Sequence, residues 1–217
     1  MSSELLRLLE VMDRLRSPGG CPWDADQTHQ SLIKYLLEES YEFVESVEAQ
    51  DREAMREELG DILLQVYFHS RIAEEHESDP FSIEDVARGI ADKLIRRHPH
   101  VFSDAKINSN DELLANWERL KAEEKGRKSA TDGVALAQPA LSLITKLIYR
   151  ADKNGIELEL PSAELNNEVP AEISIGDALV AAVVAAIKNG IEPEDLLRAR
   201  AREIADQIKQ IESLPKP

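Results

Sequence analysis

Two acidic motifs on consecutive predicted helices constrain the fold of this chain more than any other feature. Glu39 and Glu42 lie three residues apart in the first helix, and Glu58 and Asp61 lie three residues apart in the next. Residues at this spacing share one face of an α-helix. The link between the helices is short, which favours an antiparallel pair. The sequence therefore predicts packed helices on which four carboxylates converge.

Such a cluster needs a cation, because four anionic groups inside a helical bundle repel one another strongly. A single pair of glutamates at this spacing is more often a solvated helix face. Here the second motif runs directly into the apolar segment 62–68, where a carboxylate is rarely left without a partner. Ligands that are all oxygen favour Mg²⁺ or Mn²⁺, and Mg²⁺ commonly shares its coordination with substrate phosphates. Gly60 is unfavourable inside a helix, so it predicts close approach of another backbone or a ligand.

Apolar periodicity predicts an all-α protein throughout. We expect helices over about residues 5–15, 31–49, 52–77, 111–128, 138–155, 175–189 and 194–214, and a further helix that begins after Ser82. Asp51 is expected to cap the third of these helices, and Ser82 with Asp85 resembles a capping box. Residues 17–24, 103–110 and 158–174 are expected to be irregular.

Composition excludes several classes of partner. The 217 residues carry a net charge of −16, which argues against nucleic acid. Cys21 is the sole cysteine, so no intrachain disulfide can form, and this fits a reducing cytoplasm. The N-terminal segment lacks the apolar core of a signal peptide, and the longest apolar run, 178–187, is too short to span a bilayer. We therefore expect a cytoplasmic protein with no membrane partner.

A basic cluster offers a site for phosphate. Lys93, Arg96 and Arg97 occupy one helical arc, and we interpret Arg97 as a surface cation near a helix end. The alternative is that these cations simply complement the helix macrodipole. His98 and His100 flank a proline, which favours a helix terminator over a zinc site. The chain has no P-loop and no GxGxxG motif, so any nucleotide is held without a glycine-rich cradle.

Further motifs accompany the acidic pairs over about residues 1–128. They are Gly20-Cys21-Pro22-Trp23-Asp24 with Gln27-Thr28, Glu38 directly before Glu39, Lys93-x-x-Arg96-Arg97-His98-Pro99-His100-Val101-Phe102, and Asn116-Trp117-Glu118-x-x-Lys121. In this order the set resembles the signature of the MazG-type nucleoside triphosphate pyrophosphohydrolases. The resemblance implies an all-α bundle built from helix pairs of two chains, and hence a homodimer. It also implies Mg²⁺-dependent hydrolysis of nucleoside triphosphates to monophosphates and pyrophosphate, in a housecleaning role.

The resemblance also implies roles for individual residues. The metal ligands would be Glu39, Glu42, Glu58 and Asp61, with Mn²⁺ as a substitute ion. Glu38 would orient or deprotonate the attacking water, or bind a second ion. The phosphate contacts would be Lys93, Arg96 and Arg97, and Trp117 would pack near the base or ribose.

A weak internal repeat predicts two domains. The segment 59–63 is echoed by residues 175–179, and an apolar helix follows each copy. Ser174 stands where Glu58 would be, and no acidic motif precedes it. We therefore expect a catalytic domain over residues 1–128 and a degenerate repeat over residues 129–217. Two alternatives stay open: a narrower pyrophosphatase acting on dUTP, dCTP or phosphoribosyl-ATP, and a non-catalytic helical interaction protein.

Overall fold

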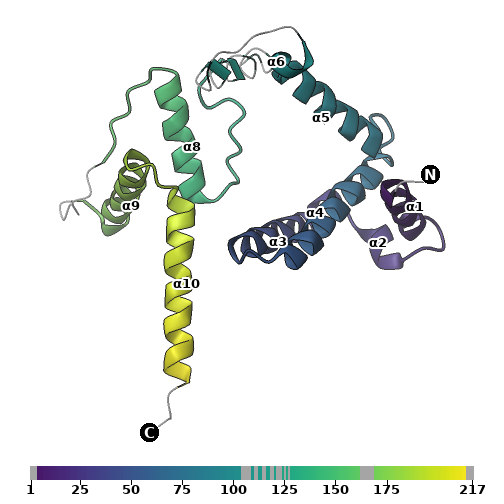
Figure 1. Ribbon diagram of the computed structural model, residues 1–217, viewed down its shortest axis with the longest axis horizontal. Coiled ribbons are helices and arrows are strands. Elements are labelled where there is room, and N and C mark those ends of the chain that lie inside the picture. Colours follow the sequence, from purple (N-terminus) through teal and green to yellow (C-terminus); the bar gives the residue numbers. More distant parts are fainter. Residues whose placement is uncertain are drawn as a thin grey trace. The chain divides into compact units, whose positions relative to one another are not determined.

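The computed structural model describes residues 4–103, 128–161 and 169–213, with scattered positions between 109 and 126. Within these residues every regular element is a helix, which confirms the all-α prediction. The chain divides into two compact units, Met1–Ser109 and Asn110–Pro217, whose helices are labelled in Figure 1. Most of the helix expected over residues 111–128 lies outside the described residues.

The first unit contains six described helices. They are α1 (Glu4–Arg16), α2 (Pro22–Asp26), α3 (His29–Glu48), α4 (Arg52–Ala73), α5 (Ile83–Arg97) and α6 (Pro99–Phe102). The four longer ones agree with the sequence prediction, although α4 ends four residues earlier than expected. The segment 17–24 was expected to be irregular, but it contains the start of α2. Pro22 opens this short helix because a proline ring suits the first helical turn, where no backbone donor is needed.

Side-chain caps fix where the helices begin. Asp51 accepts hydrogen bonds from the backbone N–H groups of Glu53 and Ala54 at 3.0 and 3.1 Å, as predicted. Ser82 and Asp85 form the predicted capping box at the start of α5. Thr28 forms a second capping box at the start of α3, which the sequence analysis missed. Only three residues separate α3 from α4, so the two helices turn back on each other and pack side by side (Figure 1).

The core of this unit lies where α1 and the first turns of α3 meet the C-terminal half of α4. Met12, Leu32, Tyr67 and Phe68 are buried there together. Trp23 of α2 packs edge-on against the ring of Phe68, with ring centroids 6.5 Å apart. Because the core occupies this end of the α3–α4 pair, the other end is free to carry polar groups.

Arg16 fastens the segment after α1 to the end of α4. Its Nη1 donates to the backbone carbonyls of Asp24 and Gln27 at 2.6 and 3.0 Å. Its Nε and Nη2 donate to the two carboxylate oxygens of Glu75, at 2.8 and 2.9 Å. Only 7% of the Arg16 side chain is exposed, so this largely buried guanidinium group links α1, α2 and the end of α4.

The second unit contains α8 (Ala140–Lys153), α9 (Ala171–Lys188) and α10 (Pro193–Glu212), which pack against one another. Its buried apolar side chains are small, including Ala181 and Val183 on α9, and Arg150 and Ser174 are buried as well. Helix α9 begins at Ala171, inside the segment that was expected to be irregular, and Pro170 is its N-cap residue. Across the described helices, none combines the length and the apolar character that crossing a membrane requires.

Candidate metal centre

Three carboxylates meet between the middle of α3 and the first half of α4. Oxygen atoms of Glu39, Glu58 and Asp61 all lie within 4.8 Å of one another. All three side chains are half-buried. The i, i+3 spacing within α4 places Glu58 and Asp61 on one face, and the antiparallel packing brings Glu39 of α3 opposite them. Three oxygen donors at this separation can coordinate one hard divalent cation.

The electrostatics of the site fit a cation. The pKa of Glu39 is raised above its usual 4.5 by burial and then by the charges of Asp61, Glu42, Glu58 and Glu38. The pKa of Glu58 is likewise raised, first by burial and then by Glu42 and Asp61. A bound divalent cation would relieve this repulsion, because it favours the ionised form of every carboxylate around it.

The two other acidic residues singled out from the sequence lie at the rim of this cluster. Glu38 and Glu42 are exposed on α3, and both are close enough to Glu39 to raise its pKa. Glu42 also raises the pKa of Glu58 on the facing helix. The structure therefore brings all five predicted carboxylates close together, and the oxygens of three of them lie within 4.8 Å of one another. No described backbone outside the helix comes within 4 Å of a Cβ placed on Gly60, so close approach of another backbone of this chain is not found, while approach of a ligand stays a prediction.

The predicted basic cluster lies on another helix. Lys93, Arg96 and Arg97 occupy the last turns of α5, which leaves α4 at an angle and runs away from α3 (Figure 1). Arg97 is only 7% exposed, so the interpretation of Arg97 as a surface cation was wrong. A position in the last turn of a helix does not by itself determine whether a side chain is exposed. Lys93 is half-buried and Arg96 is exposed.

The remaining predicted residues lie beyond α5. His98 ends α5, and its Nδ1 lies 2.7 Å from the carbonyl oxygen of Leu94, which agrees with a helix terminator. Trp117 is one of the scattered described positions and is half-buried. Its neighbours Glu118 and Lys121 lie outside the described residues.

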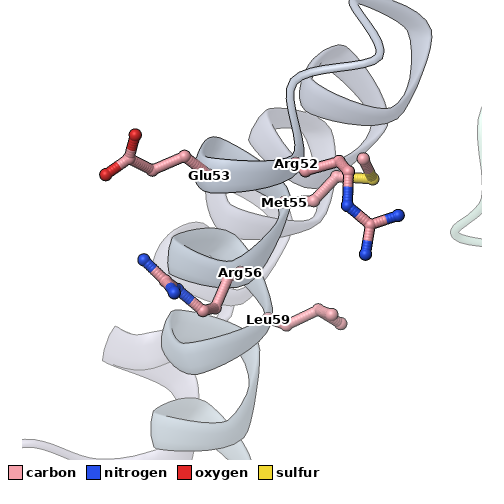
Figure 2. A pocket seen from close by; sticks show the side chains of 5 residues that line it. All are labelled: Arg52, Glu53, Met55, Arg56 and Leu59. Atoms are coloured by element: carbon pink, nitrogen blue, oxygen red, sulfur yellow. The ribbon is translucent and has the colours of Figure 1, made fainter.

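One further feature near the carboxylates was not predicted from the sequence. Arg52 and Arg56 at the start of α4 line an open hollow of about 720 Å³ together with Glu53, Met55 and Leu59 (Figure 2). Figure 2 shows Arg52, Met55 and Leu59 pointing to one side of the helix and Glu53 and Arg56 to the other. The signal available in the sequence was the presence of two arginines shortly before Glu58.

The fold and this site define an all-α protein with an acidic centre suited to a divalent cation. Residues 27–102 match the MazG nucleotide pyrophosphohydrolase domain, a range that includes every carboxylate of the cluster. The Thermotoga maritima protein named nucleoside triphosphate pyrophosphohydrolase/pyrophosphatase MazG is 38% identical over 95% of this chain and 85% of its own length. This chain therefore belongs to the MazG nucleotide pyrophosphohydrolase family.

Other proteins are similar to this chain. An uncharacterized 26.1 kDa protein of Streptomyces cacaoi is 46% identical over 97% of this chain and 83% of its own length. The nucleoside triphosphate pyrophosphohydrolase of Mycobacterium tuberculosis is 44% identical over 93% of this chain, which spans 59% of that longer protein. Among solved structures, a mazG-related protein from Thermotoga maritima is 28% identical, with a TM-score of 0.45. That alignment covers 54% of this chain and 97% of the other.

Proposed function

We propose that this protein hydrolyses nucleoside triphosphates to nucleoside monophosphates and pyrophosphate with the help of a divalent cation. The observation that supports this most strongly is the convergence of Glu39, Glu58 and Asp61 in a member of this family. Phosphoryl-type transfer depends on positioning and charge stabilisation more than on covalent catalysis. The described residues supply oxygen ligands and cations for those two tasks. A cytoplasmic housecleaning role is part of the same proposal.

The carboxylates would divide the work between them. We assign Glu39, Glu42, Glu58 and Asp61 as ligands of Mg²⁺, with Mn²⁺ as a substitute. The ion, when bound, would polarise the α-phosphoryl group and neutralise the leaving pyrophosphate. Glu38 lies beside this cluster but is exposed, so it is the carboxylate best placed to orient or deprotonate an attacking water, or to bind a second ion.

The cations would bind the triphosphate chain. Lys93 and Arg96 are at least partly exposed at the end of α5 and can reach an external phosphate. Arg97 is buried, so its contribution would combine packing at the end of α5 with a phosphate contact. Trp117, half-buried in the next segment, is proposed to pack near the base or ribose.

A second copy of the chain is proposed to complete the bundle. Ile33, Leu37 and Tyr41 follow one another at four-residue steps along α3, and more than half of each side chain is exposed. Leu59 on α4 is 53% exposed. A stripe of large apolar side chains at helical spacing is typical of a surface that is covered in the working protein. We propose a homodimer in which the α3–α4 pairs of two chains pack together.

The second unit is proposed to be a repeat that has lost its ligands. The segment 175–179, which echoes residues 59–63, lies on α9 as residues 59–63 lie on α4. Ser174, in the place of the first ligand, is buried, so no carboxylate is offered at this point. We therefore propose a catalytic domain over residues 1–128 and a non-catalytic, degenerate MazG-like repeat over residues 129–217.

The experiment that tests the proposed function measures pyrophosphate release. The purified full chain is incubated with each common nucleoside triphosphate, dUTP, dCTP and phosphoribosyl-ATP, with Mg²⁺ or with a chelator. We expect Mg²⁺-dependent pyrophosphate release from several triphosphates, and release at least about 100-fold slower from the Asp61→Asn variant. Release from only one substrate would favour the narrower enzyme. No release from any would favour the non-catalytic interaction protein.

A further inference from the structure

His29 and His69 meet at the end of the α3–α4 pair that lies away from the turn. Their Nδ1 atoms are 2.8 Å apart, their ring planes are parallel within 2°, and their centroids are 5.1 Å apart. Rings stacked face to face cannot bring two nitrogens so close, because non-bonded atoms pack at about 3.5 Å or more. The two rings therefore meet edge to edge, joined by an N–H···N hydrogen bond between α3 and α4.

This hydrogen bond tolerates only one proton between the two Nδ1 atoms. A neutral imidazole has one N–H and one bare nitrogen, whereas the protonated ring has two N–H groups and no acceptor. When both rings are protonated, the acceptor is lost and two cations face each other. Burial, and then the nearby His29, lower the pKa of His69 below its usual 6.5. Nε2 of His69 is buried with no partner among the described residues, so a protonated His69 would leave an N–H unpaired there.

The histidine pair lies in the same helical register as the carboxylates. His29 precedes Glu39 by ten residues, while His69 follows Asp61 by eight and Glu58 by eleven. In an antiparallel pair, each step forward along α3 is matched by one step backward along α4. The two contacts are thus separated by about 15 Å along the same pair of helices. A slip of one residue at the histidines would shift Glu39 by about 1.5 Å along the axis relative to the two α4 ligands.

Several charged or titratable groups lie beside His29. Glu75, His76 and Asp79 line a hollow of about 350 Å³ with His29 at the end of α4 and in the loop that follows. Arg16, from α1, forms its ion pair with Glu75 and so offsets that negative charge. His76 uses its Nδ1 to accept the backbone N–H of Asp79, within its own loop. The lowered pKa of His69 comes from burial and from His29, and none of these other charged groups contributes to it.

We propose that His29 and His69 are positioning residues whose Nδ1–Nδ1 hydrogen bond fixes the register of α3 against α4, and so holds Glu39 opposite Glu58 and Asp61 for the cation. Protonation of both rings breaks this link and weakens cation binding. The inference rests on the proposed function, because it takes the three carboxylates to be metal ligands. Neither histidine touches the cation or the nucleotide in this account.

The test measures Mn²⁺ binding to the full chain by electron paramagnetic resonance, which needs no turnover. His29→Leu removes the hydrogen bond. His29→Asn retains a polar atom near the position of Nδ1 but does not titrate. At about pH 7.5 we expect His29→Leu to weaken Mn²⁺ binding three- to tenfold, roughly the equilibrium effect of one hydrogen bond. His29→Asn should stay within about twofold of wild type, and His76→Asn, in the same hollow, should have no effect.

Acid provides the second arm of this test. Between about pH 7 and pH 5.5, where histidine titrates, wild type should lose Mn²⁺ affinity more steeply than His29→Asn. Both proteins share the carboxylates, so the difference isolates the histidine pair. Equal affinity in His29→Leu and wild type, or equal pH dependence in His29→Asn and wild type, would overturn the proposal.

A spectroscopic measurement on wild type tests the hydrogen bond even if a variant fails to fold. In wild type labelled with ¹⁵N-histidine, the two Nδ1 atoms should show a coupling across the hydrogen bond that disappears in acid. Absence of this coupling at about pH 7.5 would also overturn the proposal. A protein that binds Mn²⁺ in the expected pattern but hydrolyses no triphosphate would refute the proposed function and leave the positioning role standing.

Discussion

Replacing Glu39 with glutamine should stabilise the metal-free protein while removing its response to Mg²⁺. The pKa of Glu39 is raised above 4.5, so its carboxyl group holds a proton more tightly in the folded chain than in the unfolded chain. The stability that this group contributes is therefore complete below pH 4.5 and is lost as the pH rises through the raised folded-state pKa. At neutral pH, without metal, the ionised Glu39 destabilises the fold.

After burial, the three charges that raise the pKa of Glu39 most set the size of the effect. Asp61, Glu42 and Glu58 each repel Glu39 from a partly solvated position. A like-charge contact of this kind costs about 0.2–0.5 kcal/mol. Removing three of them should stabilise the metal-free protein by about 0.5–1.5 kcal/mol, which raises the melting temperature by about 2–5 °C in a chain of this size.

Mg²⁺ should reverse the order of stability. At a concentration 100 times its Kd, the ion stabilises the folded wild type by about 2.7 kcal/mol, which corresponds to about 5–10 °C. The Glu39→Gln variant has lost a charged ligand, so it should gain little from the same addition. Wild type should thus melt below the variant in chelator and above it in Mg²⁺.

The assay is thermal unfolding followed by circular dichroism, with chelator and with Mg²⁺. Glu45→Gln is the matched control, since Glu45 is exposed on the same helix and does not contribute to the raised pKa of Glu39. The control should stay within about 0.5 kcal/mol of wild type in both conditions. The reasoning fails if Glu39→Gln melts below wild type in chelator, or if Mg²⁺ stabilises both proteins equally.

Four further outcomes are expected. Glu42→Gln and Asp61→Asn should each lower the Mg²⁺-dependent rate by about 100-fold or more with folding intact, and full activity in either would remove it from the ligand set. Arg16→Gln should lower the free energy of unfolding by about 2–4 kcal/mol in denaturant, because the Arg16 side chain is largely buried and makes four hydrogen bonds. A smaller loss would show that these contacts are dispensable. As the pH drops below about 6.5, the free energy of unfolding of wild type should decrease, and that of His69→Asn should decrease less. The pKa of His69 is lowered in the folded chain, so the unfolded chain binds the proton first. A purified fragment of residues 129–217 should hydrolyse no triphosphate, and activity there would place the active site in the other half of the chain.

The helices and their starting points could be predicted because they depend on neighbouring residues. The caps at Asp51 and Ser82 need only a side chain and the backbone of the next turn. The i, i+3 spacing within each acidic motif is equally local, and it placed Glu58 and Asp61 on one face. The short link between α3 and α4 then sufficed to predict which two helices meet.

The rest depended on contacts between residues far apart in the sequence. The bond between His29 and His69 joins residues forty positions apart, and no local pattern reveals it. Arg97 is buried, whereas its sequence context resembles an exposed helix end. Helix α9 began earlier than expected because Pro170 was interpreted as part of an irregular segment, although a proline at a helix boundary fits either interpretation.

Hydrolysis in heavy-oxygen water tests the central claim most directly. Attack by water on the α-phosphorus forms a new bond between the water oxygen and the nucleoside monophosphate, with unlabelled pyrophosphate as the leaving group. The full chain with Mg²⁺ and a nucleoside triphosphate should therefore place the label in the monophosphate alone, as mass spectrometry of both products would show. Label in the pyrophosphate would mean attack at the β-phosphorus. Release of diphosphate and orthophosphate would mean cleavage of a different bond. Either result would contradict the assignment of this site as a pyrophosphohydrolase centre.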